Sequence, residues 1–104
     1  MATQSALLTL LKLQLIISTT AYDALLTQKL SAAKDMIARE GATLPDTENS
    51  YTAEDNELVV GYAAYLWRKG KSDDTVFPRW LRYALNNRVL HDRAQSQGGD
   101  DDGA

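Results

Sequence analysis

The stretch between residues 58 and 67 constrains the fold of this chain more than any other. It reads LVVGYAAYLW, and the spacing of Thr52 and Asp55 ahead of it predicts an N-terminal helix cap. Apolar side chains would then surround almost the whole helix, which is stable in water only if neighbours cover every side. Gly61 and the two alanines would let those neighbours approach closely. We therefore expect a central helix that ends at Gly70 after a cationic last turn.

Three further helices are predicted from apolar residues that recur three and four positions apart. The first should run from about residue 5 to residue 15, and the second should begin at a Thr20 cap and end at Gly41. The fourth should start with Pro78 in its first turn and end at about Arg93. Because no alternating pattern persists, the expected fold class is all-α: a small bundle of about four helices with a flexible acidic C-terminal tail.

Each of these helices has one stripe of side chains that we expect to be buried. In order along the chain, the stripes consist of Leu7, Leu8, Leu11 and Leu15; of Tyr22, Leu25, Leu26, Leu30, Ala33, Met36 and Ile37; and of Trp80, Leu81, Ala84 and Leu85. A chain of 104 residues with 44% hydrophobic content suits one core. We expect one helical domain over residues 1–94. The tail over residues 95–104 has no apolar residue except the terminal alanine, so we expect it to be disordered until a partner orders it.

The composition argues against several classes of protein. The sequence has no cysteine, which removes disulfides and every zinc site that relies on sulfur. The leucine-rich start is interrupted by Lys12 and Gln14, so we predict a soluble protein with neither a secretory signal nor a membrane span. A formal net charge of −3 disfavours general affinity for the nucleic-acid backbone.

Catalytic chemistry has little support in the sequence. His91 is the single histidine, so a catalytic triad would have to combine it with a serine or threonine hydroxyl. We interpret His91 instead as a residue in the last turn of the fourth helix that complements the helix dipole. The run Asp100, Asp101 and Asp102 lies on a glycine-rich end that we expect to be too mobile for tight metal binding. We therefore expect neither an enzyme nor a bound cofactor or metal.

Two other groups of residues have a structural interpretation that we prefer to a functional one. Acidic residues in the first turn of the third helix, namely Glu54, Asp55 and Glu57, would stabilise that helix end. Aromatic residues at helical spacing are more often core residues or interface anchors than a ligand cage. This second group consists of Tyr62, Tyr65, Trp67, Trp80 and Tyr83.

The fourth helix has a basic stripe that is the best candidate for a binding surface. A rotation of 100° per residue places Arg79, Arg82, Asn86 and Arg93 on one face, opposite Leu81 and Leu85. The stripe is either a solvated face, a subunit or portal interface, a surface for another protein, or a nucleic-acid site. Arg88 falls within the apolar sector, so it must snorkel, pair with an acid or lie under a neighbouring subunit. Arg88 and His91 complete the candidate interface.

The sequence from Leu58 to Arg93, LVVGYAAYLWRKGKSDDTVFPRWLRYALNNRVLHDR, resembles tailed-phage head–tail connectors of the small helical adaptor type. The earlier segment LLTLLKLQLIISTTAYDALLTQKLSAAKDMIARE is similar to the helical hairpin at the start of that family. Together these segments cover about nine tenths of the chain. The resemblance lies in the order of the helices and not in one diagnostic motif.

The resemblance implies a function in virus assembly. Members of the family form a ring, usually dodecameric, under the portal protein, where they extend the DNA channel toward a stopper or tail-side connector. We would then expect synthesis in the cytoplasm of a bacterial host and a final location at the head–tail interface of the virion. The family commonly grips the portal with its C-terminal segment, which here corresponds to the chain after Arg93. The glycine-rich acidic ending departs from a docking helix.

Two hypotheses about charge follow, and one alternative stays open. A negative channel wall would let DNA slide through without specific binding. Arginines of the basic stripe could pair with Asp23, Asp35 or Glu40 of a neighbouring copy and so close a ring. The alternative is a helical DNA-packaging or regulatory protein whose fourth helix contacts nucleic acid.

Overall fold

The computed structural model describes residues 3–72 and 74–103, and within these residues every regular element is helical. Their order is α1 (Thr3–Leu15), α2 (Asp23–Glu40), the 3-10 turn η1 (Glu48–Ser50), α3 (Ala53–Lys71) and α4 (Arg79–Gly103). The predicted all-α class with about four helices is therefore confirmed. None of the helices in the described part of the chain is both long and apolar enough to cross a bilayer.

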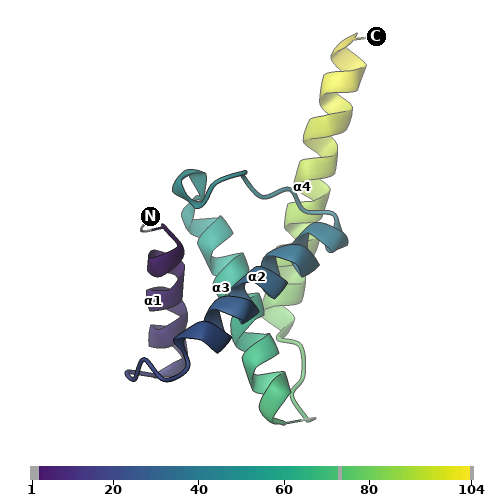
Figure 1. The fold of residues 1–104 in the computed structure, drawn as a ribbon. Helices are drawn as coiled ribbons and strands as arrows, with labels where there is room; N and C mark the ends of the chain where they lie inside the picture. Colours follow the sequence, from purple (N-terminus) through teal and green to yellow (C-terminus); the bar gives the residue numbers. More distant parts are fainter. Residues whose placement is uncertain (1–2, 73, 104) are drawn as a thin grey trace.

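Helix α3 is the centre of the fold, as its apolar circumference predicts. Figure 1 shows α1 on one side of α3 and α4 on the other, with α2 crossing α3 obliquely. Eight residues between Leu58 and Trp67 of α3 are buried in this position: Leu58, Val59, Val60, Gly61, Tyr62, Ala63, Ala64 and Trp67. The other helices cover them with Leu7, Leu11, Leu26, Leu30, Ala33, Ile37, Leu81 and Leu85. A single core therefore joins all four helices.

Several residues at the edges of the predicted stripes are exposed, which corrects the sequence interpretation. Tyr22, Leu25 and Met36 of the second stripe and Trp80 of the fourth all reach solvent. Four other residues of the α2 stripe, by contrast, are buried: Leu26, Leu30, Ala33 and Ile37. Because α2 crosses α3 at an angle, α3 covers the middle of the stripe and leaves its margins open.

The helix caps were predicted correctly at two ends and incorrectly at two others. Thr52 Oγ1 accepts a hydrogen bond from the Asp55 N–H, and Asp55 Oδ2 accepts one from the Thr52 N–H, which forms a capping box. Gly41 closes α2 with φ 108°. Thr20 does not cap α2 through its side chain: its carbonyl accepts the Asp23 N–H at 3.1 Å. The N-cap position belongs to Tyr22, which makes no side-chain capping bond.

The ends of α3 and α4 also differ from the sequence prediction. Helix α3 continues through Gly70 to Lys71, and the Ser72 N–H bonds to the Arg68 carbonyl at 3.0 Å. Gly70 therefore stays helical and does not supply a left-handed end. Helix α4 passes Arg93 and ends at Gly103. No proline follows Pro78, so each added residue extends the backbone ladder despite the low helix propensity of glycine and aspartate. Ordering of residues 95–104 by a partner stays a prediction.

The ring of Trp80 lies directly on Gly61. A Cβ at residue 61 would stand 2.6 and 2.9 Å from two carbons of that ring. At Gly70 of the same helix, the nearest atom to such a Cβ is the Lys29 ammonium nitrogen at 3.9 Å. The two glycines therefore form a matched pair, one crowded and one open.

We expect Gly61→Ala to lower the free energy of unfolding by about 1 kcal/mol, since overpacking outweighs the gain in helix propensity. The indole of Trp80 must move, so its fluorescence emission should shift as well. Gly70→Ala is the control, and it should stabilise the chain by up to about 1 kcal/mol because only the propensity changes. Urea unfolding of the three proteins checks the order. Equal stabilisation by both substitutions would contradict the close contact.

Candidate functional site

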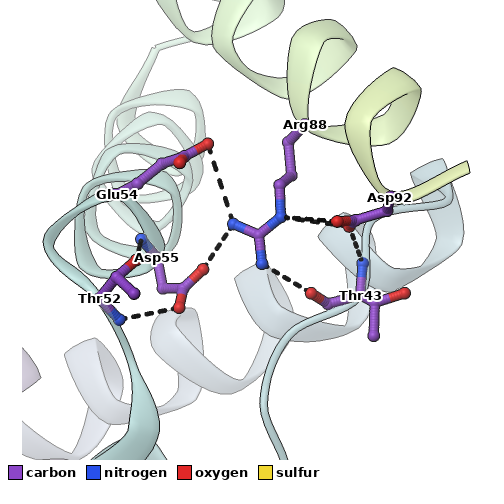
Figure 2. Close-up of polar contacts among 6 residues, drawn as sticks. All are labelled: Thr43, Thr52, Glu54, Asp55, Arg88 and Asp92. Carbon is purple, nitrogen blue, oxygen red and sulfur yellow. Dashed lines mark hydrogen bonds and ion pairs between the residues drawn. The ribbon is translucent and has the colours of Figure 1, made fainter. Parts of the chain in front are cut away.

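The most extensive polar cluster of the described chain surrounds Arg88 of α4 (Figure 2). Its Nη1 lies 2.5 Å from Asp55 Oδ1 and 3.9 Å from Glu54 Oε2, at the start of α3. Its Nε lies 3.2 and 3.1 Å from the two carboxylate oxygens of Asp92, one turn further along α4. Its Nη2 donates to the Thr43 carbonyl at 2.7 Å, and the Thr43 N–H donates to Asp92 Oδ2 at 2.7 Å. We call these five residues the Arg88 clasp.

The clasp ties helix α4 to two segments that are distant from it in sequence. It joins the connection after α2, the start of α3 and the middle of α4 (Figure 2). Arg88 was expected to snorkel, to pair with an acid or to lie under a neighbouring subunit. In the structure it pairs with acids. Asp55 is buried, so its charge depends on this partner and on the bonds with Thr52.

The electrostatics of the clasp favour the charged forms of both central groups. Burial alone would raise the pKa of Asp55, but hydrogen bonds with the Thr52 backbone and the Arg88 side chain outweigh it and lower that pKa. Burial alone would lower the pKa of Arg88, and its bonds with Asp55 and Asp92 raise it instead. Asp55 and Arg88 are therefore an ion pair over the ordinary pH range.

The clasp has the character of a structural joint. Each of its three kinds of guanidinium nitrogen already donates within the chain, so little capacity is left to hold a phosphate or another ligand. A hollow of about 210 Å³ lies beside it, lined by Thr52, Glu54, Asp55, Arg88, His91 and Asp92. His91 is exposed there and does not lie in the last turn of α4, because that helix continues to Gly103. No group of three or more possible ligands that could hold a metal ion occurs among the described residues.

The basic stripe of α4 divides into one engaged arginine and an open part. Arg82 donates to both carboxylate oxygens of Glu40 at 3.1 and 3.4 Å, and its guanidinium lies 4.6 Å from the centre of the Phe77 ring. The remaining members, Arg79, Asn86 and Arg93, are exposed. Within the described part of the chain, neither Arg79 nor Arg93 has an ion pair.

Two of the three acids expected to pair across a subunit boundary are engaged within the chain. Glu40 holds Arg82, and Asp23 pairs with Lys12 at 2.8 Å. Asp35 is exposed. An inter-subunit pair with Glu40 or Asp23 would therefore have to replace an existing one.

The five aromatic residues do not gather into one cluster. Tyr62 and Tyr65 make edge contacts with each other and with Phe77, at centroid distances of 4.8 to 6.0 Å. Trp67 meets Tyr22 edge-on at 5.4 Å, and Trp80 covers Gly61. Tyr83 is exposed. Tyr62, Tyr65, Trp67 and Trp80 therefore act as core and covering residues in the chain.

Two exposed apolar surfaces were not predicted from the sequence. The first, which we call the α1 ridge, consists of Leu10, Leu13 and Ile16. The second, which we call the α4 outer face, contains Tyr83 and Leu90 between Arg79, Asn86 and Arg93. Leu10 and Leu13 lie outside the predicted stripe of their helix, and that second row of leucines was the signal available. The helical angles of Tyr83 and Leu90 place them opposite Leu81 and Leu85.

No protein-family model matches this sequence, and no curated protein or solved structure is significantly similar to it.

Proposed function

We propose that this protein is a structural head–tail connector of a tailed phage, which forms a ring under the portal and extends the DNA channel toward the tail. The observation that carries the proposal is the arm formed by α4. Among its side chains up to Gln95, the fully buried ones are Leu81 and Leu85 in the first two turns, and beyond the Arg88 clasp the helix extends away from the bundle (Figure 1). A helix that its own chain leaves largely uncovered is suited to contact another protein.

The order of the helices also supports the proposal. A short α1, a bend and a longer α2 closed by Gly41 precede the apolar α3 and the arm. This is the order that the resemblance to small helical connectors implies. In this proposal, the Arg88 clasp fixes the angle at which the arm leaves the bundle, and the arm reaches the portal. The net charge of −3 suits a channel through which DNA slides without specific binding.

Static light scattering tests the proposal directly. We expect the chain, mixed with the portal protein of the same virus, to form a defined complex whose mass corresponds to the portal plus a ring of connector copies. A variant that ends at Gln95 is the matched control, because every core residue identified in the described chain precedes that point. We expect this variant to keep its helical bundle and to lose portal binding.

Two results would count against the proposal, the first against the connector itself and the second against the role of its arm. One is an 11.5 kDa monomer that ignores the portal at every concentration. The other is undiminished portal binding by the chain that ends at Gln95, which would remove the arm from the proposal. Salt-dependent binding of duplex DNA by the monomer would favour the nucleic-acid alternative, with Arg79 and Arg93 as the contacts to replace first.

A further inference from the structure

Helix α1 ends in a conformation that its sequence does not favour. The Ile16 N–H bonds to the Leu13 carbonyl at 3.2 Å, and the Ile17 N–H bonds to the Lys12 carbonyl at 2.9 Å. This pair of bonds is the Schellman ending, which requires a left-handed residue at its turn, and Ile16 has φ 59°. A β-branched residue rarely adopts that backbone region because its side chain is crowded there.

The same chain shows how this ending is normally made. Helix α2 closes with an equivalent pair of bonds, from Gly41 to Ala38 and from Ala42 to Ile37, and glycine occupies the left-handed position. At the end of α1 the corresponding residue is isoleucine, and its side chain is 91% exposed. Packing of the side chain within the chain therefore does not offset the strain, and this makes Ile16 a candidate for a contact with another molecule.

Ile16 is part of a larger apolar surface with an acidic edge. Leu13, one turn earlier, is 70% exposed, and Leu10 reaches solvent beside a groove of about 330 Å³ between α1 and α3. The groove is lined by Leu10, Gln14, Ala53, Asn56, Glu57 and Val60. Glu57 is exposed, and within the described part of the chain no ion pair engages its carboxylate. The Leu10 end of the α1 ridge thus borders an unpaired negative charge.

The α4 outer face has the complementary composition. Tyr83 and Leu90, each 61% exposed, form its apolar centre, and the unpaired Arg79 and Arg93 lie at its edge. This face is directed away from the core residues of its own helix. Figure 1 shows α1 and α4 on opposite sides of α3, so one chain cannot bring its own ridge onto its own outer face.

We propose that the α1 ridge of one copy packs against the α4 outer face of a second copy, with Ile16 as a docking residue. Both centres are apolar, and Glu57 meets an arginine-lined edge, so the two surfaces match in polarity and in charge. Because the surfaces differ, the contact is head-to-tail and can repeat from copy to copy until it closes. This inference rests on the proposed ring, and it deepens that proposal by naming the two faces that meet.

The Ile16→Gly variant should change self-association and stability in opposite directions, so it tests docking independently of folding. Glycine relieves the left-handed strain, so we expect the melting temperature of the chain to rise by about 4 to 8 °C. The same change removes the docking side chain, so we expect self-association to weaken at least about tenfold. An unchanged association constant in the stabilised variant would overturn the role of Ile16.

Chemical cross-linking then tests which faces meet. The sequence has no cysteine, so introduced thiols are the only reactive ones. We would mix a Gln14→Cys chain with an Asn86→Cys chain and couple their thiols with a short bismaleimide, because both positions are exposed and flank the two apolar centres without altering them. A Gln28→Cys chain, exposed on α2, replaces the Gln14→Cys chain as the control.

We expect a covalent heterodimer from the first mixture and only background from the control mixture. Preferential coupling of two Gln14→Cys chains, or of two Asn86→Cys chains, would indicate a symmetric contact and overturn the proposal. Absence of the heterodimer in samples that form a ring by light scattering would also overturn it, while leaving the proposed function intact. A chain that neither associates nor binds the portal would refute both.

Discussion

Replacing Arg88 with methionine is expected to lower the free energy of unfolding by about 3 to 5 kcal/mol, which is the usual effect of removing one partner of a buried ion pair. Methionine preserves much of the side-chain volume, so the loss of stability measures the effect of removing the charge and the hydrogen bonds. The substitution leaves the buried Asp55 carboxylate without its guanidinium and the Thr43 carbonyl without its donor. Urea unfolding at neutral pH measures the effect.

The destabilisation by Arg88→Met should depend on pH in a defined direction. In the natural chain the pKa of Asp55 is lowered, so its contribution to stability is present above the unfolded value, about 3.9, and is lost as the pH falls through the folded value. Without Arg88, fewer interactions oppose the effect of burial on Asp55, so the pKa of Asp55 in the folded state rises. The difference in stability between the two proteins should therefore be largest near neutral pH and should shrink in acid.

The double variant Arg88→Met, Asp55→Asn provides the control. Asparagine keeps an acceptor for the Thr52 N–H but carries no charge, so the double variant should lose less stability than Arg88→Met alone. Its difference from the natural chain should also depend less on pH. Equal losses in the single and double variants would show that the charge of Asp55 does not govern the clasp.

The centre of the fold was predictable because its signals are local. A ten-residue apolar run leaves α3 no stable position except the middle, and the capping pair Thr52 and Asp55 fixes where that helix begins. Gly41 likewise identifies the end of α2 through its backbone freedom alone. Each of these features depends on residues within a few positions of one another.

The Arg88 clasp and the α1 ridge were not predictable in the same way. The helical angle of Arg88 showed that a charge would lie in the apolar sector, but its partners Asp55 and Thr43 are 33 and 45 positions away in the sequence. The conformation of Ile16 is a property of the bend that follows α1, and isoleucine normally argues against it. Pairing across the fold and backbone strain therefore needed the three-dimensional arrangement.

Few buried side chains attach α4 to the bundle, so truncation of one of them should cause a large loss of stability. Between Arg79 and Gln95, the fully buried side chains of this helix are Leu81 and Leu85, while Ala84 and Val89 are partly buried beside them. We expect Leu85→Ala to lower the free energy of unfolding by about 2 to 5 kcal/mol, since it removes buried surface and leaves a cavity between α4 and α3. Leu90→Ala on the exposed side should change it by no more than about 0.5 kcal/mol.

Hydrogen exchange resolved by residue distinguishes loss of α4 alone from loss of the whole bundle. Helix α4 shares fewer buried residues with the core than α2 or α3 does, so in the Leu85→Ala variant its amides should exchange faster than those of α3. The Arg88 clasp adds a polar attachment one turn further along, so the Leu85→Ala and Arg88→Met effects should couple, and the double variant should release the arm. Uniformly faster amide exchange in all four helices would show instead that the arm and the bundle unfold as one unit. The attachment of the arm would then be as stable as the core itself.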